Sequence, residues 1–404
     1  MPQPASGHLI CTRNPGGLED ALPLMKSISR SILDAHNQLL RLCGSRLKVA
    51  GPDAAAGLQE RRVVVEAGSR QDDNPLETRV NGTNTSAFTF DWPAAELYRL
   101  RDTWLTGDQG QVFLSDGSLF EPWVRPYNLE KLKICRPLKI AAKRISGPVF
   151  HLTGRNHENR GHFMLQHLPR LMAARDYLKS LPDYKLLVAP GHARWQARYI
   201  TWAGLDPSKI VEGTRGTMQV DDLIFVPNLY GKSSLCPPPF YDELSECAAS
   251  YPVENGPGRP LFITRRDAPD KQLENEERIV EILRSKIGPV DVIRLGDYPL
   301  PVQIGMFRAS PLIIGPIGQG ICNILFCKTS LLVMLAPGTP ENQVYTSAHG
   351  SQLARICGNE ALTFLSNEPA PSRGDWTFPE ERFAMLLDRL LQQPEAARLK
   401  SSAS

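Results

Sequence analysis

The chain has 404 residues, more than one hydrophobic core usually supports, so the length predicts two domains, or three if the N-terminal part folds separately. A formal net charge of +3 argues against a nucleic acid partner, which requires a concentrated basic face. No apolar run is long enough to span a membrane, and the start lacks the basic-then-apolar order of a signal peptide, so we expect a cytoplasmic protein.

The N-terminal third predicts an arm, one helix and short β-like pieces. Residues 1–20 are rich in proline, glycine and polar side chains and predict a loose arm. A helix with one apolar stripe follows over residues 23–39, suited to packing on a core, to a dimer seam or to a membrane surface. Short β-like pieces such as residues 62–65 come next. We expect residues 1–145 to form an arm, a helix and a β-rich extension packed on the first domain.

Two stretches then repeat an alternation of strands and helices, which is typical of a mostly parallel, doubly wound sheet. The first has strands at 149–152, 184–188, 209–211 and 223–226, with helices at 162–180 and 195–202. The second has strands at 261–263, 290–294, 312–314 and 331–335, with helices at 275–286, 300–309 and 379–393. Linker signals at 236–239 and 254–260 place the boundary near residue 257. We therefore expect two Rossmann-like domains facing a cleft, 146–256 and 257–404, the second with a final crossing helix.

A glycine-rich turn, Gly315-Pro316-Ile317-Gly318-Gln319-Gly320, separates the third strand of the second domain from an apolar helix. Glycines let a backbone approach a ligand, and a helix N-terminus offers free N–H groups to phosphate oxygens. The turn therefore predicts a phosphate site, with a tight turn that binds nothing as the alternative.

Arg265 and Arg266 follow the first strand of the same domain. Ligands of open α/β sheets bind beyond the carboxyl ends of the strands, and arginine suits bidentate contact with phosphate. Both are predicted donor-binding residues. The alternative is a solvated charge cluster with Asp267 and Asp270.

In the first domain, Asn159 is a candidate helix cap, and His162 follows it by one turn. A neutral imidazole facing the cleft could accept the proton of an acceptor hydroxyl, so His162 is the predicted base. A structural histidine is the alternative. His157, Glu158 and His167 are weaker candidates.

The order of these features resembles the family 61 glycosyltransferases, often labelled capsular polysaccharide biosynthesis proteins in bacteria. The resemblance covers residues 150–358. It rests on Asn-x-x-His before an apolar helix, the Thr-Arg strand end, Asn275-Glu276, a helix with Gln303, and the turn followed by Asn323-x-x-Phe326.

The resemblance implies a GT-B architecture and an inverting mechanism. The substrate would be a nucleotide-sugar donor, with no cofactor and no essential metal. It assigns Asn159, His162 and, four positions on, Gln166 to the acceptor side. To donor binding it assigns Arg265, Asn275, Glu276, Gly318, Gly320 and Asn323. Gly315 and Gln319 complete the predicted donor turn, and His162 and Arg265 are the predicted catalytic residues.

Four positions depart from the family pattern. Ile317 and Gln319 stand where the family usually has His and Ala, Gln166 where it has an acid, and Met334 where it often has a Glu suited to ribose hydroxyls. Each replacement at Ile317, Gln166 and Met334 removes a charge or a hydrogen bond.

The expected activity is sugar transfer to a glycan or lipid-linked acceptor in bacterial polysaccharide biosynthesis. A small-molecule or peptide acceptor and a non-catalytic scaffold that binds nucleotide sugars are the alternatives. A homodimer and a peripheral association with the inner face of the membrane are both left open. The eight cysteines include no C-x-x-C pair, and Asp221-Asp222 is expected at the exposed start of a strand, so no metal site is predicted.

Overall fold

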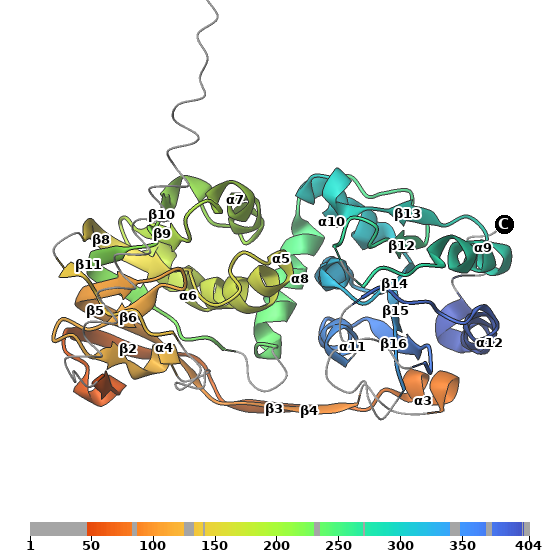
Figure 1. Cartoon of the computed structure of the whole chain (residues 1–404), viewed down its shortest axis with the longest axis horizontal. Helices are drawn as coiled ribbons and strands as arrows, with labels where there is room; N and C mark the ends of the chain where they lie inside the picture. Colours follow the sequence, from red (N-terminus) through yellow and green to blue (C-terminus); the bar gives the residue numbers. More distant parts are fainter. Residues whose placement is uncertain are drawn as a thin grey trace, which may run out of the picture.

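The computed structural model describes residues 47–82, 87–124, 133–139, 142–229, 235–269, 271–339, 348–368, 374–397 and 399. They form two lobes, each built on a sheet (Figure 1). The helix expected over residues 23–39 lies outside the described residues.

The first lobe contains a mixed nine-stranded sheet in the order β1-β7-β6-β5-β11-β8-β9-β10, with β2 paired to β5. The strands β10, β9, β8 and β11 run parallel and have the order 3-2-1-4 that is typical of a doubly wound sheet. They confirm the four strands predicted for this domain, and their bounds are β8 Lys143–His151, β9 Lys185–Val188, β10 Ile210–Glu212 and β11 Thr217–Phe225. The helices of the lobe are α4 Glu121–Val124, α5 Arg160–His162, the π-helical η4 Phe163–His167, α6 Leu168–Ser180 and α7 Ala193–Trp202, and short 3-10 turns are η1 Pro52–Ala54 and η5 Pro207–Lys209.

The N-terminal third extends this sheet. Strand β5 pairs antiparallel with β11 from Tyr98 opposite Phe225 to Thr106 opposite Thr217. The strands involved are β1 Val49–Ala50, β2 Leu58–Val65, β5 Ala95–Thr106, β6 Gln111–Phe113 and β7 Leu119–Phe120.

The pairing of β5 with β11 corrects one expectation. Asp221 and Asp222 lie inside β11 and not at its start, because the strand continues back to Thr217. Asp222 forms a two-point ion pair with Arg99, and Asp221 pairs with Arg144 at 2.8 Å.

The second lobe contains a five-stranded parallel sheet in the order β13-β12-β14-β15-β16. Because side chains alternate along a strand, Ile313 packs toward one face while Leu312 and Ile314 pack toward the other. Helices α9 and α12 contribute to the core of one face, and α10, η7 and α11 to the core of the other. The strands are β12 Leu261–Ile263, β13 Asp291–Ile293, β14 Leu312–Pro316, β15 Leu331–Ala336 and β16 Glu360–Leu365. The helices are α9 Glu276–Ile287, η6 Leu295–Asp297, α10 Leu300–Ala309, η7 Gln319–Phe326, α11 Ala348–Ile356, α12 Glu380–Leu391 and η8 Pro394–Ala396. The strands and helices predicted for this domain are confirmed to within about two residues.

Helix α8, Pro238–Ser250, begins inside the first predicted linker signal, residues 236–239. Pro238 and Pro239 occupy its first turn, where the missing N–H groups need no acceptor, so these prolines begin a helix instead of excluding one. The helix packs against α6 of the first lobe and against α10, α11 and η7 of the second (Figure 1).

The lobes share one apolar core. Residues of α6 and α7 belong to the same buried cluster as residues of β14 and η7. The Trp202 and Phe326 rings meet edge to face across it, with centroids 5.1 Å apart. Burial of these apolar side chains holds the two lobes together through the hydrophobic effect.

A ribbon of two strands, β3 Gly68–Asp72 and β4 Phe88–Trp92, also connects the lobes (Figure 1). It carries α3, Pro75–Asn81, onto β16 and α12 of the second lobe. Asn74 caps α3 and donates to Ala361 O at 2.6 Å, while the Glu77 carboxylate accepts from Thr363 N at 2.8 Å. The expected packing of residues 1–145 on the first domain thus does not include α3, because its apolar side completes the core of the second lobe.

Candidate functional site

A cavity of about 380 Å³ lies where the two lobes meet, a size that suits a small ligand. The first lobe contributes Arg160, Gly161, Met164 and Tyr199. The second contributes the loops after β12 and β14, together with neighbouring side chains: Ile263, Thr264, Arg265, Asp267, Ala268, Pro269, Leu295, Gly296, Gln303, Pro316, Gly318, Gln319, Gly320, Ile321 and Asn323.

The position of the cavity follows from the strand order. In the second sheet, β12 has β13 on one side and β14 on the other. The order in which the chain adds strands to the sheet therefore reverses between β12 and β14. Loops that leave such neighbouring strands in opposite directions open a crevice at their carboxyl ends, where open α/β sheets bind ligands. The two loops of this crevice carry Arg265 and Gly318.

Arg265 lies directly against the glycine turn. A Cβ atom on Gly318 would overlap Arg265 Nη1, so only glycine allows this approach. A Cβ on Gly320 would lie 2.8 Å from Leu295 Cδ1, and one on Gly315 would lie 2.5 Å from Ile263 O. Gly318 and Gly320 therefore let Arg265 and Leu295 approach the turn in the cavity wall, whereas Gly315 lets β14 pack on β12 and does not line the cavity.

The apolar helix expected after the turn is η7, a 3-10 helix. Ile321 N donates to Gly318 O, and Ile317 N donates to Leu335 O. The N–H groups of Gln319 and Gly320 have no acceptor within the helix, since a helix leaves its first donors unpaired. These backbone groups can serve an anion bound in the cavity.

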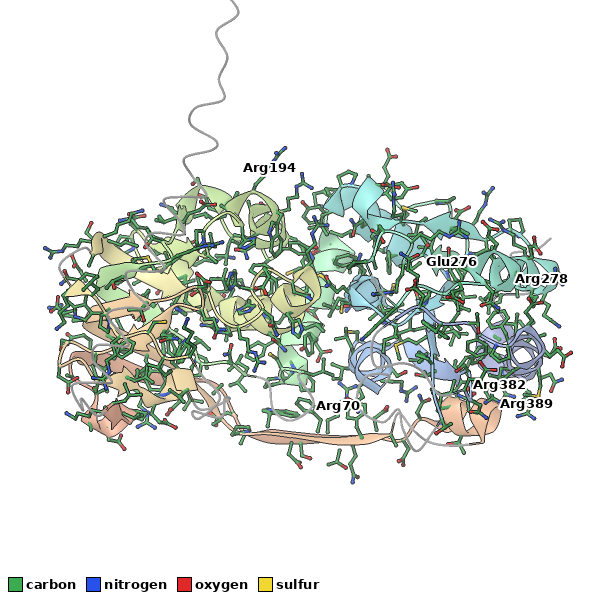
Figure 2. The ribbon with its side chains drawn as sticks, viewed as in Figure 1. Arg70, Arg194, Glu276, Arg278, Arg382 and Arg389 are labelled. Atoms are coloured by element: carbon green, nitrogen blue, oxygen red, sulfur yellow. The ribbon has the colours of Figure 1, made fainter. Side chains whose placement is uncertain are left out.

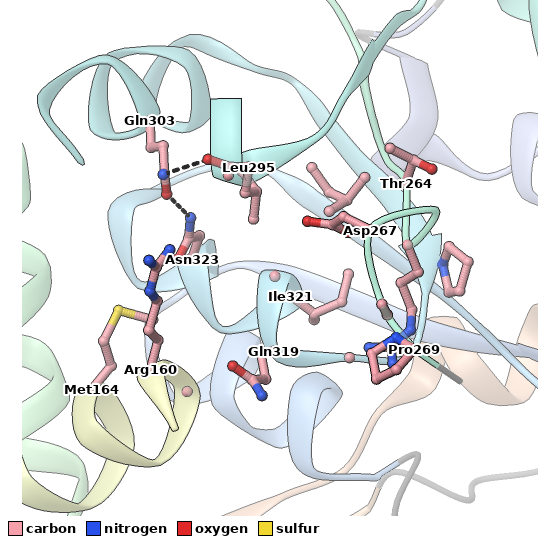
Figure 3. Close-up of a pocket in the computed structure, with 18 of the residues that line it drawn as sticks. Arg160, Met164, Thr264, Asp267, Pro269, Leu295, Gln303, Gln319, Ile321 and Asn323 are labelled. Carbon is pink, nitrogen blue, oxygen red and sulfur yellow. Dashed lines mark hydrogen bonds between the residues drawn. The ribbon is translucent and has the colours of Figure 1, made fainter. Parts of the chain in front are cut away.

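On the other side of the cavity, Asn323 takes part in a hydrogen-bond network through Gln303. Asn323 Nδ2 donates to Gln303 Oε1 at 2.8 Å, and Gln303 Nε2 donates to Leu295 O and Tyr298 O (Figure 3). The network links η7, α10 and η6, so Asn323 lines the cavity but already uses its amide to join these elements.

Besides Gly315, three further predicted donor residues do not line the cavity. Arg266 pairs with Glu276 at 3.1 Å and with Glu277 at 3.0 Å. The buried Glu276 carboxylate also accepts from Thr264 Oγ1, and Asn275 exchanges hydrogen bonds with the backbone of Phe378. Their contacts shape the loop after β12 and fix the chain before α12.

On the first lobe, Asn159 caps α5 as predicted, with Oδ1 accepting from His162 N at 3.1 Å. The half-buried His162 and the buried Gln166 do not line the cavity. Their neighbours Arg160 and Met164 do (Figure 3), and so does Gly161.

The strand ends of the first lobe are closed by Arg170. Its buried guanidinium donates to His151 O and Thr153 O after β8 and to Val226 O after β11. Burial, together with the charge of Arg170, lowers the pKa of His151 to about 3 and holds the pKa of His167 well below its usual value. These imidazoles are therefore neutral, and they are buried among the hydrogen bonds that Arg170 makes at the strand ends.

The structure shows what surrounds two of the positions that depart from the family pattern, Met334 and Gln319. Met334 is buried, and a Cβ on Gly350 would overlap its sulfur, so apolar packing occupies this position. Gln319 lines the cavity with an exposed side chain. Ile317 does not line it.

Of the cavity wall, Arg265, Gly318, Gln319, Gly320 and Asn323 are predicted from the sequence. Several other wall residues are not predicted, although some of them have a local signal. Thr264 and Asp267 flank Arg265 on the same loop, and Arg160 lies between Asn159 and His162. No local signal marks Tyr199 or Met164, which reach the cavity through the packing of helices. The missed residues with side chains in the wall are Arg160, Met164, Tyr199, Ile263, Thr264, Asp267, Ala268, Pro269, Leu295, Gln303 and Ile321, while Pro316 belongs to the predicted turn.

These features define an α/β protein with a crevice at the reversal point of a parallel sheet, lined by Arg265 and the first turn of η7. The chain carries a glycosyltransferase family 61 domain, since the family model described as Glycosyltransferase 61 matches residues 161–334. The match begins at the first-lobe wall of the cavity and includes the glycine turn. No curated protein matches the chain. Among the described residues, no helix is long and apolar enough to cross a membrane.

Proposed function

We propose that the protein is an inverting glycosyltransferase of GT-B architecture. It moves a sugar from a nucleotide-sugar donor to a hydroxyl of a glycan or lipid-linked acceptor in bacterial polysaccharide biosynthesis. The observation that carries the proposal is the meeting of Arg265 with the Gly318–Gly320 turn in a cavity within the matched domain. A guanidinium beside helix N–H groups suits a diphosphate.

In the proposed reaction, the acceptor oxygen bonds to the anomeric carbon as the bond from that carbon to the diphosphate oxygen breaks. The electron pair leaves with the nucleoside diphosphate, and the acceptor proton passes to a base. Arg265 and the amides of η7 stabilise the leaving charge. His162 is the proposed base because α5, on which it lies, forms the first-lobe wall of the cavity through Arg160 and Gly161.

We propose that no metal is essential, because the Arg265 guanidinium and the N-terminus of η7 bring positive charge to the diphosphate. Donor hydrolysis should then persist in excess chelator. Loss of hydrolysis in chelator and its recovery with a divalent cation would contradict this part of the proposal.

A thermal-shift panel of nucleoside diphosphates and nucleotide sugars tests donor binding. A ligand at 100 times its dissociation constant stabilises the folded protein by about 2.7 kcal/mol. Arg265→Ala should abolish the shift. Arg278→Ala, an exposed arginine of α9 on the outer side of the same lobe (Figure 2), should retain it. No shift with any member of the panel would contradict the proposal.

Enzyme assays distinguish the remaining hypotheses about the function. If the protein transfers sugar to a small molecule or peptide but not to a glycan, the acceptor is of that other class. Donor binding without hydrolysis or transfer would favour a non-catalytic scaffold, a reading that the position of His162 outside the cavity wall also favours.

A further inference from the structure

The first-lobe wall of the cavity carries one charged side chain among the described residues. Of its four contributors, Gly161, Met164 and Tyr199 are uncharged, and Arg160 is a guanidinium. The second lobe faces it with Arg265 and one carboxylate, Asp267. The cavity between the lobes is therefore bordered by an arginine from each lobe.

The backbone that carries Arg160 is firmly placed. Asn159 caps the turn through His162 N, and Phe163 N donates to Asn159 O at 2.8 Å. A Cβ on Gly161 would lie 3.4 Å from both Gln319 Cβ and Cys322 Sγ. The Arg160–Gly161 turn thus packs against the first turn of η7, the helix that begins at the glycine turn.

The Arg160 side chain is available for a ligand. It is exposed, and within the described part of the chain it has neither a hydrogen bond nor an ion pair. In Figure 3 it extends from its helix toward Asn323 of η7. By contrast, Arg170 is hydrogen bonded to backbone carbonyls, and Arg266 and Arg294 are held by carboxylates. An arginine without a counterion on a cavity wall is suited to an anionic ligand.

We propose that Arg160 is a second diphosphate-binding and catalytic residue, which the first lobe supplies to a donor held by the second. The inference rests on the proposed function. The leaving diphosphate lies between Arg160 and Arg265 beside the N-terminus of η7. As the sugar–phosphate bond breaks and its electron pair moves onto the phosphate oxygen, both guanidinium groups stabilise the added charge. The first lobe therefore contributes to donor binding as well as to acceptor binding.

The test compares Arg160→Ala and Arg160→Lys with Arg194→Ala. Arg194 is an exposed arginine of α7 in the same lobe that points away from the molecule (Figure 2) and does not line the cavity. Isothermal titration measures binding of inorganic pyrophosphate, of UDP, GDP, CDP and dTDP, and of the matching monophosphates. Thermal unfolding without ligand checks that each variant is folded, which is expected because Arg160 makes no contact that folding needs.

We expect Arg160→Ala to weaken pyrophosphate and the bound nucleoside diphosphate by about tenfold or more, since a hydrogen bond to a charged group is lost. The monophosphate should weaken less, Arg160→Lys should lie between, and Arg194→Ala should match wild type. Equal diphosphate affinity in wild type and Arg160→Ala would overturn the role of Arg160 while leaving the proposed function intact. Pyrophosphate binding that depends on Arg160 without binding of any nucleoside diphosphate would support the anion contact and contradict the proposed donor. A wild-type protein that binds none of these anions would overturn both.

Discussion

Arg265 Nη1 occupies the position where residue 318 would carry a side chain, which is possible because that residue is glycine. The contact joins the loop after β12 to the turn after β14 at the point where the strand order reverses. One arginine and one glycine therefore shape together the side of the cavity where we propose that the diphosphate binds.

Gly318→Ala should weaken binding of the donor, because the added methyl group displaces either Arg265 or the turn. We expect about a tenfold rise in the dissociation constant for a nucleoside diphosphate, measured by titration. The control is Gly216→Ala, where a Cβ would meet nothing closer than Thr214 Oγ1 at 3.8 Å. Unchanged affinity in Gly318→Ala would show that the diphosphate does not use this contact.

His162→Ala should lower the turnover number of sugar transfer by roughly 10² to 10⁴ if its imidazole is the base. Affinity for the nucleoside diphosphate should stay unchanged, because the ring does not line the cavity. Steady-state kinetics with separate titration of the diphosphate distinguishes the two effects. Full activity in His162→Ala would exclude it as the base and direct attention to Asp267, the carboxylate that lines the cavity among the described residues.

Asn74→Ala should destabilise the contact of α3 with the second lobe. The change removes a helix cap, which costs about 1 kcal/mol of stability. It also leaves Ala361 O without the amide donor of Asn74, which costs about 1–3 kcal/mol. Chemical denaturation should report a loss of about 2 kcal/mol or more. Asp73→Ala, an exposed neighbour, should change stability little, and an equal loss in both variants would argue against a specific role of Asn74.

Acid should destabilise the first lobe through His151. Its pKa is about 3 in the folded protein and near 6.5 when unfolded, so the unfolded chain binds more protons between these values. The contribution of His151 to the free energy of unfolding is fully present above about pH 6.5. It falls as the pH decreases, by up to about 1.4 kcal/mol per pH unit. Denaturation at pH 7.5, 6.5 and 5.5 measures the slope. His151→Asn, which keeps an oxygen acceptor for Arg170, should have a shallower slope than wild type, and an identical slope would contradict the assignment.

Many of the strands and helices of the second lobe could be predicted from the sequence. Continuous apolar runs such as residues 312–314 and 331–335 are typical of buried parallel strands, and amphipathic stretches between them supply the helices. The glycine turn and Arg265 could be found because each directly follows a strand, and the carboxyl ends of parallel strands lie at one edge of the sheet.

The N-terminal third and the linker were less readable. Pro238 and Pro239 look like breakers, but a helix tolerates proline in its first turn, and only the packing of α8 between the lobes stabilises the helix there. In the same way, nothing local to residues 75–81 indicates that α3 docks on β16, because the partners are almost 300 residues away in the chain.

The alternation of strands and helices, the glycine turn and the neighbouring arginine follow from the sequence, since they depend on local spacing and on where strands end. Which polar residues reach the cavity depends instead on how the two lobes pack. Glu276, Asn275 and Arg266 satisfy one another or the backbone, while Arg160 and Tyr199 arrive from the other lobe. The reason is physical: a side chain's partners are set by packing between distant segments, and a buried polar group takes whichever partner that packing brings within reach.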